Sequence, residues 1–358
     1  MSALETELLR YCREGHLAFA KNVPVSSVVF DERAIYKCKY GCRNFDRKHS
    51  CPPEATHARK MIGQARYKWV LLFATTSEIP RCYSLYRRRL ENYIRENEIQ
   101  RISLDFDAIF NQHGRAHRTL SGGSCHRCRI CARMKGHACI RPSRMQTSME
   151  AIGIDCQKTM HRAGFDFQMP NTDSINRCGC VFHSTESLKG LHFFKTKSIQ
   201  RYVRPTLAET MIHCRDLVSS NPDLFESVRI VPTTRLPVGG KECHKCTHKG
   251  RNYACPPYAS PIEINLWTHA VIWKWSGNDR DKDGYNRAFL EFHKKVFSLG
   301  HYLSLGLRDG PCDECTRCAL NVGKNTECPH RRLMAPSMQS QGIDKSRFGS
   351  GRYGIELI

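Results

Sequence analysis

The strongest constraint on this chain's fold is that its sequence passes twice through the same motifs. A closely spaced cysteine pair followed by Cys-Pro-Pro occurs at residues 36–42 and 50–53, and again at residues 241–246 and 254–257. Eight residues separate the pair from the Cys-Pro-Pro in both copies. Because two copies of one sequence fold to the same plan, each assignment in one half can be checked against the other. We therefore predict a tandem duplication.

Each half is expected to contain a hydrophobic strand, a helix and a closing strand, in that order. These elements fall at residues 68–75, 86–94 and 176–181 in the first half, and at 269–275, 283–300 and 351–356 in the second. The expected fold class is α/β, with two homologous small α/β modules related by a pseudo-two-fold axis and clusters held in the loops. The expected domains are residues 1–183 and 206–358, with a linker at 184–205.

The repeat also sorts the 20 cysteines of the chain. Those that recur in both halves are candidate metal ligands, and they form the pairs Cys12/Cys214, Cys38/Cys243, Cys42/Cys246, Cys51/Cys255, Cys125/Cys312, Cys128/Cys315, Cys131/Cys318 and Cys139/Cys328. The other four, Cys82, Cys156, Cys178 and Cys180, have no cysteine counterpart. Because a free cysteine behaves as a small hydrophobic residue when buried, these four are predicted to pack in the core.

The sequence gives no sign of secretion or membrane insertion. Its longest apolar run, residues 69–74, is far shorter than the roughly 20 residues that a membrane-spanning helix needs. The N-terminus has neither a basic start nor an apolar stretch. We expect a cytoplasmic protein with no membrane association. Thiols stay reduced in that compartment, so clustered cysteines indicate metal ligands rather than disulfides.

The formal net charge of the chain is +22. Sixteen thiolates around four 2+ cubane cores, or the same thiolates around zinc, would reduce this to about +14. A charge of this size predicts an acidic protein partner or a redox complex, with nucleic acid as an alternative. An arginine-rich surface around anionic clusters accounts for the charge equally well.

The densest motif is Cys-x2-Cys-x2-Cys followed by a fourth cysteine. It occurs at Cys125, Cys128, Cys131 and Cys139, and again at Cys312, Cys315, Cys318 and Cys328. Two-residue spacers let consecutive thiolates reach three corners of one [4Fe-4S] cubane. Zinc prefers well-separated Cys-x2-Cys pairs, and three cysteines in a row crowd a tetrahedral site. The motif favours an iron–sulfur cluster, with zinc as the alternative metal.

The Cys-Pro-Pro motif supplies three thiolates in each copy, from Cys38, Cys42 and Cys51 and from Cys243, Cys246 and Cys255. If Cys12 and Cys214 complete these sets, the sites are saturated clusters or zinc. If they are instead buried structural cysteines, one iron of each cluster stays open to a substrate or sulfide. Both alternatives remain, and the expected total is two to four [4Fe-4S] clusters per chain.

Other motifs carry less weight. Residues 323–326 resemble the end of a phosphate-binding loop, but Cys318 occupies the place of a required glycine. No Gly-x-Gly-x-x-Gly follows a strand, and the Cys-x3-Cys-x2-Cys spacing of radical S-adenosylmethionine enzymes does not occur. Histidines near the cysteines are more often solvated than ligating. They are His126, His137, His244, His248 and His330.

A third string, Ser-Met-x-x-x-Gly-Ile-Asp, occurs at residues 148–155 and 337–344. Together with the Cys-Pro-Pro and Cys-x2-Cys-x2-Cys motifs, it resembles the pattern of a domain-of-unknown-function family. That family is catalogued as predicted metal-binding proteins, mostly from anaerobic bacteria and archaea, including methanogens. This chain departs from it by fusing two copies. The resemblance implies cluster binding in an anaerobic setting and supplies no established reaction.

The sequence leaves three candidate functions. The first is an iron–sulfur protein for electron transfer or metallocluster handling in a larger anaerobic redox or cofactor-assembly complex. The second is an enzyme that uses an open cluster iron for sulfur transfer or reduction, with tRNA as a candidate substrate. The third is a zinc-stapled nucleic-acid-binding protein. The sequence identifies no catalytic residue for any of them.

Overall fold

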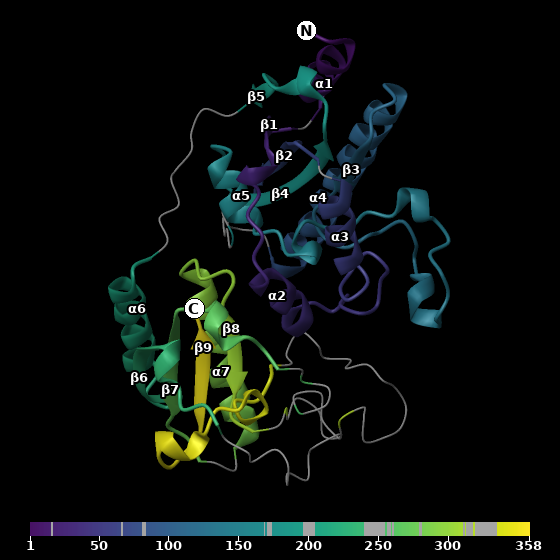
Figure 1. Ribbon diagram of the computed structural model, residues 1–358. Coiled ribbons are helices and arrows are strands. Elements are labelled where there is room, and N and C mark those ends of the chain that lie inside the picture. Colours follow the sequence, from purple (N-terminus) through teal and green to yellow (C-terminus); the bar gives the residue numbers. More distant parts are fainter. Residues whose placement is uncertain are drawn as a thin grey trace. The chain divides into compact units, whose positions relative to one another are not determined.

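The computed structural model of the chain divides into two compact units, Met1–Cys38 with Asn44–Tyr202, and Lys39–Arg43 with Val203–Ile358 (Figure 1). The structure describes residues 1–15, 17–65, 67–80, 84–167, 169, 174–195, 205–239, 255, 259, 261–278, 281–310, 312, 318 and 335–358. No helix in these ranges is long and apolar enough to cross a membrane.

The first unit is built on a five-stranded antiparallel sheet with the strand order β3-β4-β2-β1-β5. Its strands are β1 (Phe19–Pro24), β2 (Trp69–Glu78), β3 (His117–Leu120), β4 (Ser174–His183) and β5 (His192–Phe194). Its helices are α1 (Ala3–Glu14), α3 (Thr56–Ala65), α4 (Leu85–Gln112), α5 (Cys156–Arg162) and the greater part of α2 (Arg33–Gly41), whose residues from Lys39 onward are assigned to the second unit. Strand β5 lies within residues 184–205, the segment expected to be a linker. Because β5 pairs with β1, it extends the sheet of the first unit.

The second unit repeats this plan with a four-stranded antiparallel sheet in the order β6-β7-β9-β8. Its strands are β6 (Phe225–Pro232), β7 (His269–Trp275), β8 (Leu305–Arg308) and β9 (Tyr353–Leu357), and its helices are α6 (Leu207–Ser220) and α7 (Lys282–Ser298). The order matches β1-β2-β4-β3 of the first unit. The registers match too, since Lys21 faces Leu72 and Arg229 faces Ile272.

Short 3-10 helices join these elements. They are η1 (Val25–Ser27), η2 (Ala132–Lys135), η3 (Pro142–Arg144), η4 (Glu150–Ile152), η5 (Glu186–Leu188), η6 (Thr233–Arg235), η8 (Ile264–Leu266), η10 (Gln339–Gln341) and η11 (Lys345–Phe348). The equivalent pairs η1/η6 and η4/η10 recur at matching places. The duplicated α/β architecture predicted from the sequence is therefore confirmed.

Both faces of the first sheet are covered, because strand side chains alternate between them. Leu71 and Phe73 of β2 pack with α1 and the second part of α4. Val70, Leu72 and Ala74 point to the opposite face, where they pack with α3, η4 and α5. The two clusters thus mark two sides of one sheet, and a residue's cluster tells which side it lies on.

Helix α4 confirms the helix predicted from apolar spacing, but the residues that gave the prediction are exposed. Tyr86, Leu90, Tyr93 and Ile94 keep between 44% and 76% of their surface accessible. The packed part of α4 is its second half, which contributes the fully buried Phe106 to the core. The spacing identified the helix correctly and did not identify its buried stretch.

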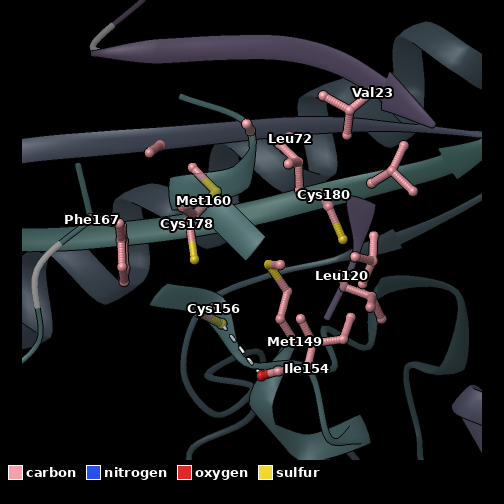
Figure 2. Packing of buried hydrophobic residues seen from close by; sticks show 14 of the residues in the cluster. Val23, Leu72, Leu120, Met149, Ile154, Cys156, Met160, Phe167, Cys178 and Cys180 are labelled. Carbon is pink, nitrogen blue, oxygen red and sulfur yellow. Dashed lines mark hydrogen bonds between the residues drawn. The ribbon is translucent and has the colours of Figure 1, made fainter. Parts of the chain in front are cut away.

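Three of the four cysteines without a counterpart lie in the core, as predicted: Cys178 and Cys180 in β4, and Cys156 in α5. Figure 2 shows Cys156, Cys178 and Cys180 among apolar side chains that include Leu72 and Met160. Burial raises the pKa of the Cys180 thiol, and interaction with Cys178 together with burial raises the pKa of Cys156. The thiols of Cys156 and Cys180 are therefore protonated, and all three cysteines serve as packing residues. The fourth unmatched cysteine, Cys82, lies outside the described residues.

Candidate metal centre

The first-copy Cys-x2-Cys-x2-Cys motif lies in the long segment between β3 and α5. Its thiols, at Cys125, Cys128, Cys131 and Cys139, are free and partly exposed. The described cysteines form no disulfide. Free thiols gathered in one short segment are donors suited to iron or zinc. The donor chemistry of this segment therefore fits the metal that the sequence predicts.

Two side chains of α4 hold the turn that leads into this motif. Gln100 is fully buried, donates to the Ser124 carbonyl at 2.6 Å and accepts from the His126 backbone N–H at 3.2 Å. Glu96 accepts from the Ser124 backbone N–H at 2.8 Å and contacts Nε2 of His126 at 2.8 Å. Gly123 has φ +71°, and a Cβ there would collide with the Glu96 carboxylate. The turn is thus fitted closely to the helix.

Glu96 is held as an anion at this turn. Burial raises its pKa, but the hydrogen bond and charge of His126 and the charge of Arg177 outweigh burial. The net pKa of Glu96 therefore lies below its usual range. Since His126 faces this carboxylate, its Nε2 is already engaged by a partner on α4.

The Cys-Pro-Pro loop contacts the Cys-x2-Cys-x2-Cys motif directly. The Ser50 hydroxyl accepts from the Cys125 backbone N–H at 3.2 Å. Lys48 Nζ donates to the Cys125 carbonyl at 2.7 Å and to the Ser124 hydroxyl at 3.1 Å, and Asn44 also donates to that hydroxyl, at 2.9 Å. The backbones beside Cys51 and at Cys125 are therefore tied together, although 74 positions separate these two cysteines in the sequence.

We call these contacts between the Cys-Pro-Pro loop and the Cys125 turn the junction, and a second set of contacts extends it. Arg133, in η2, forms ion pairs with Asp46 and Glu54 on either side of the Cys-Pro-Pro. His49 Nε2 lies 2.8 Å from the His137 carbonyl. The two cysteine-bearing loops thus form one layer. Within the described residues, no three side chains of Cys, His, Asp or Glu converge on a common metal position.

Cys12 lies away from this layer. It is fully buried in α1, in the cluster with Leu71 and Phe73. Ala55 and Ile62, which follow the Cys-Pro-Pro, belong to the cluster on the opposite face of the sheet. Burial raises the pKa of the Cys12 thiol to about 12, so this group is a thiol at neutral pH.

Cys214 occupies the same place in the second unit. It is fully buried in α6 among Phe225, Trp273 and Phe292. Burial, with a smaller contribution from the charge of Glu356, raises its pKa to about 12. The first recurring cysteine of each copy therefore lies on the buried side of a helix, packed among apolar side chains.

The second-copy motif keeps the same framework. The backbone N–H of Arg308 donates to the Pro336 carbonyl at 3.0 Å, as that of Ser121 does to Thr147 at 2.8 Å. The backbone N–H groups of Met149 and Met338 bond back to the carbonyls of Ser121 and Arg308, so the start of each Ser-Met-x-x-x-Gly-Ile-Asp string is held beside the turn before the cysteine triad. Arg308 is fully buried and donates from Nη1 to the Cys312 sulfur at 3.6 Å.

The remaining second-copy candidates are only partly covered by the structure. Cys255 is buried and Cys318 is partly exposed. Cys243, Cys246, Cys315 and Cys328, with His244, His248 and His330, lie outside the described residues. In the first copy, Cys38 lies in α2 and Cys42 follows it, both partly exposed.

Sequence reasoning missed the residues that support the site. Gln100 lies 24 positions before Ser124 and Glu96 lies 28 positions before it, and no spacing rule links them to the motif. Ser50 had a weak signal, because it directly precedes Cys51. Such supporting residues are expected around metal ligands, since they fix the orientation of the ligand-bearing loops.

Comparison with known proteins assigns the family. The family described as predicted metal-binding protein (DUF2284) matches residues 21–183 and again residues 230–349. The chain belongs to this family and contains two copies of its domain. No curated protein and no solved structure matches the chain.

Proposed function

We propose that this tandem member of the family holds iron–sulfur clusters on its repeated cysteine motifs and works in electron transfer or metallocluster handling within a larger complex. The observation that carries the proposal is the junction between the two cysteine-bearing loops, where Ser50 bonds the backbone of Cys125. Loops joined in this way would hold two cluster sites side by side, as exchange of electrons or of a metal unit requires. Two isolated structural metals would need no such junction.

The ligand pattern supports iron over zinc. Three consecutive cysteines with two-residue spacers suit the corners of a cubane and crowd a zinc tetrahedron. In the first copy, Glu96 and Gln100 fix the backbone at Ser124 and His126, on both sides of the first ligand. A preformed turn of this kind reduces the ordering that cluster binding requires.

Basic groups beside the loops suit the charge of such clusters. Four thiolates around a 2+ cubane leave a net charge of about −2. Lys48 Nζ lies 2.7 Å from the Cys125 carbonyl and supplies a positive charge at the junction. The excess charge of the chain, +22 before any metal binds, favours an acidic protein partner.

The position of Cys12 and Cys214 favours a second candidate function. Both are buried in apolar clusters under helices, so we propose that they are packing residues and not ligands. The Cys-Pro-Pro sets would then supply three thiolates each and leave one coordination position free of cysteine. Such a position suits an enzyme for sulfur transfer or reduction.

The test is anaerobic purification of the full chain followed by iron, sulfide and zinc analysis. About 16 iron atoms per chain would support four cubanes, and about 8 would support clusters at the Cys-x2-Cys-x2-Cys motifs alone. Replacing Cys128 with alanine should remove about 4 iron atoms, and so should replacing Cys318. A colourless protein with stoichiometric zinc would contradict the proposal and favour the nucleic-acid-binding alternative.

A further inference from the structure

The second unit has a cavity of about 480 Å³ against the outer face of its sheet. Its walls include the arginines Arg229, Arg235 and Arg347 and the ring of Phe348, and its floor includes Val231 and Ile272. We call it the arginine pocket. None of its described lining residues is a cysteine, and its chemistry does not depend on the proposed metal clusters.

In the first unit a helix covers the face of the sheet that corresponds to the pocket, and the described residues of the second unit contain no matching helix. In the first unit, α5 and the segment after it cover β1, with Phe165 stacked on Phe19 at 4.9 Å between ring centroids. Cys178 follows Asp155 by 23 positions, whereas its counterpart Tyr353 follows Asp344 by only 9. In place of α5 the second copy has the single turn η11.

The shorter connection also changes the partner of the basic residue at matching positions of β1 and β6. Lys21 in β1 donates from Nζ to the Ala163 carbonyl at 2.9 Å, at the end of α5. The matching residue in β6 is Arg229, which has no such helix end to bond. Its guanidinium carbon lies 6.0 Å from the centroid of the Phe348 ring instead.

The guanidinium groups are weakly neutralised. Arg347 approaches the Asp344 carboxylate at 3.5 Å, but its side chain remains 74% exposed. Within the described part of the chain, Arg229 and Arg235 form no ion pair with a carboxylate. Clustered arginines without matching carboxylates are suited to bind an anion from outside the chain.

We propose that the arginine pocket binds a small phosphate ester that carries a planar aromatic group, of the mononucleotide class. Guanidinium groups bind phosphate through paired hydrogen bonds. The Phe348 ring, with Val231 and Ile272, forms a wall on which a planar group can pack. A volume of about 480 Å³ lies within the range of small-ligand sites and is too small to enclose a folded nucleic acid.

The test is calorimetric titration of the full chain with AMP, with adenosine and inorganic phosphate as partial probes. AMP should bind at least tenfold more tightly than either probe, and its affinity should fall with added salt. Arg229→Gln and Arg235→Gln should each weaken AMP binding about tenfold. Lys21→Gln, at the matching first-copy position, should leave AMP affinity unchanged. Thermal melting would establish that the variants are folded.

Three outcomes would overturn the proposal. One is the absence of AMP binding by the folded wild-type chain. Another is equal affinity for AMP and inorganic phosphate, because the apolar wall would then contribute nothing. The third is arginine-dependent binding of single-stranded RNA that AMP does not displace, which would assign these arginines to a nucleic-acid surface.

Discussion

Replacing Cys12 with alanine tests which cysteines are ligands. Cys12 is fully buried among apolar side chains, and its thiol has a pKa raised to about 12. Removing one buried sulfur atom loses an apolar contribution of about 1 kcal/mol and leaves a small cavity. We expect Cys12→Ala to lower the free energy of unfolding by about 1–2 kcal/mol and to leave the metal content unchanged.

The experiment needs one core control and one ligand control. Cys180→Ala is the core control, because Cys180 is equally buried and has no cysteine counterpart in the repeat. It should show the same loss of stability and the same full metal content. Cys51→Ala is the ligand control and should remove about 4 iron atoms per chain if its site holds a cubane.

The assay is iron analysis of anaerobically purified protein, combined with denaturant unfolding followed by circular dichroism. A loss of about 4 iron atoms in Cys12→Ala, matching Cys51→Ala, would refute the assignment of Cys12 as a packing residue. It would show that the helix rearranges to bring this thiol to the Cys-Pro-Pro set. The same pair of measurements on Cys214→Ala applies to the second copy.

Three further predictions address the supports of the site and the core. Gln100→Ala leaves buried polar groups unpaired at the Ser124 turn. It should lower the free energy of unfolding by about 1–3 kcal/mol and speed the loss of metal to a chelator. The control is Asn97→Ala, which should do neither, because the Asn97 amide donates to the Tyr93 carbonyl of its own helix. Burial lowers the pKa of His183 to about 4, so the unfolded chain takes up this proton first as the pH falls. The free energy of unfolding should therefore decrease by about 2 kcal/mol between pH ~7 and ~5. Urea unfolding at both pH values should show this loss, and His183→Ile, which copies Ile358 of the second unit, should abolish it, whereas an unchanged pH dependence would contradict the assignment. Arg308→Gln removes a donor to the Cys312 sulfur. Because a lost charge-assisted hydrogen bond is worth about 1.5 kcal/mol, the reduction potential of a second-copy cluster should become more negative by up to about 60 mV in an EPR-monitored titration. Ser121→Ala, at the matching first-copy position, should cause no such shift.

The sequence was sufficient for features that depend on local pattern or on the repeat. The apolar runs at residues 69–74 and 269–275 predicted the central strands, because burial on both faces requires a continuous apolar segment. Comparing Cys178 and Cys180 with Tyr353 and Ile355 placed those two cysteines in the core, since equivalent strand positions face the same way.

Only the tertiary structure decided which distant residues meet. Cys12 and Cys51 recur together in both copies, yet the sheet separates Cys12 from the segment that follows Cys51, because α1 packs on one face and α3 on the other. Cys125 and Ser50 meet in a backbone-to-hydroxyl hydrogen bond although they come from two different loops of the first unit. The periodicity of a segment records its own environment, whereas such contacts depend on the order of strands and on the path of every connection between them. For the same reason, the shorter connection after Asp344 places the single turn η11 beside the arginine pocket, where the longer connection of the first copy forms α5.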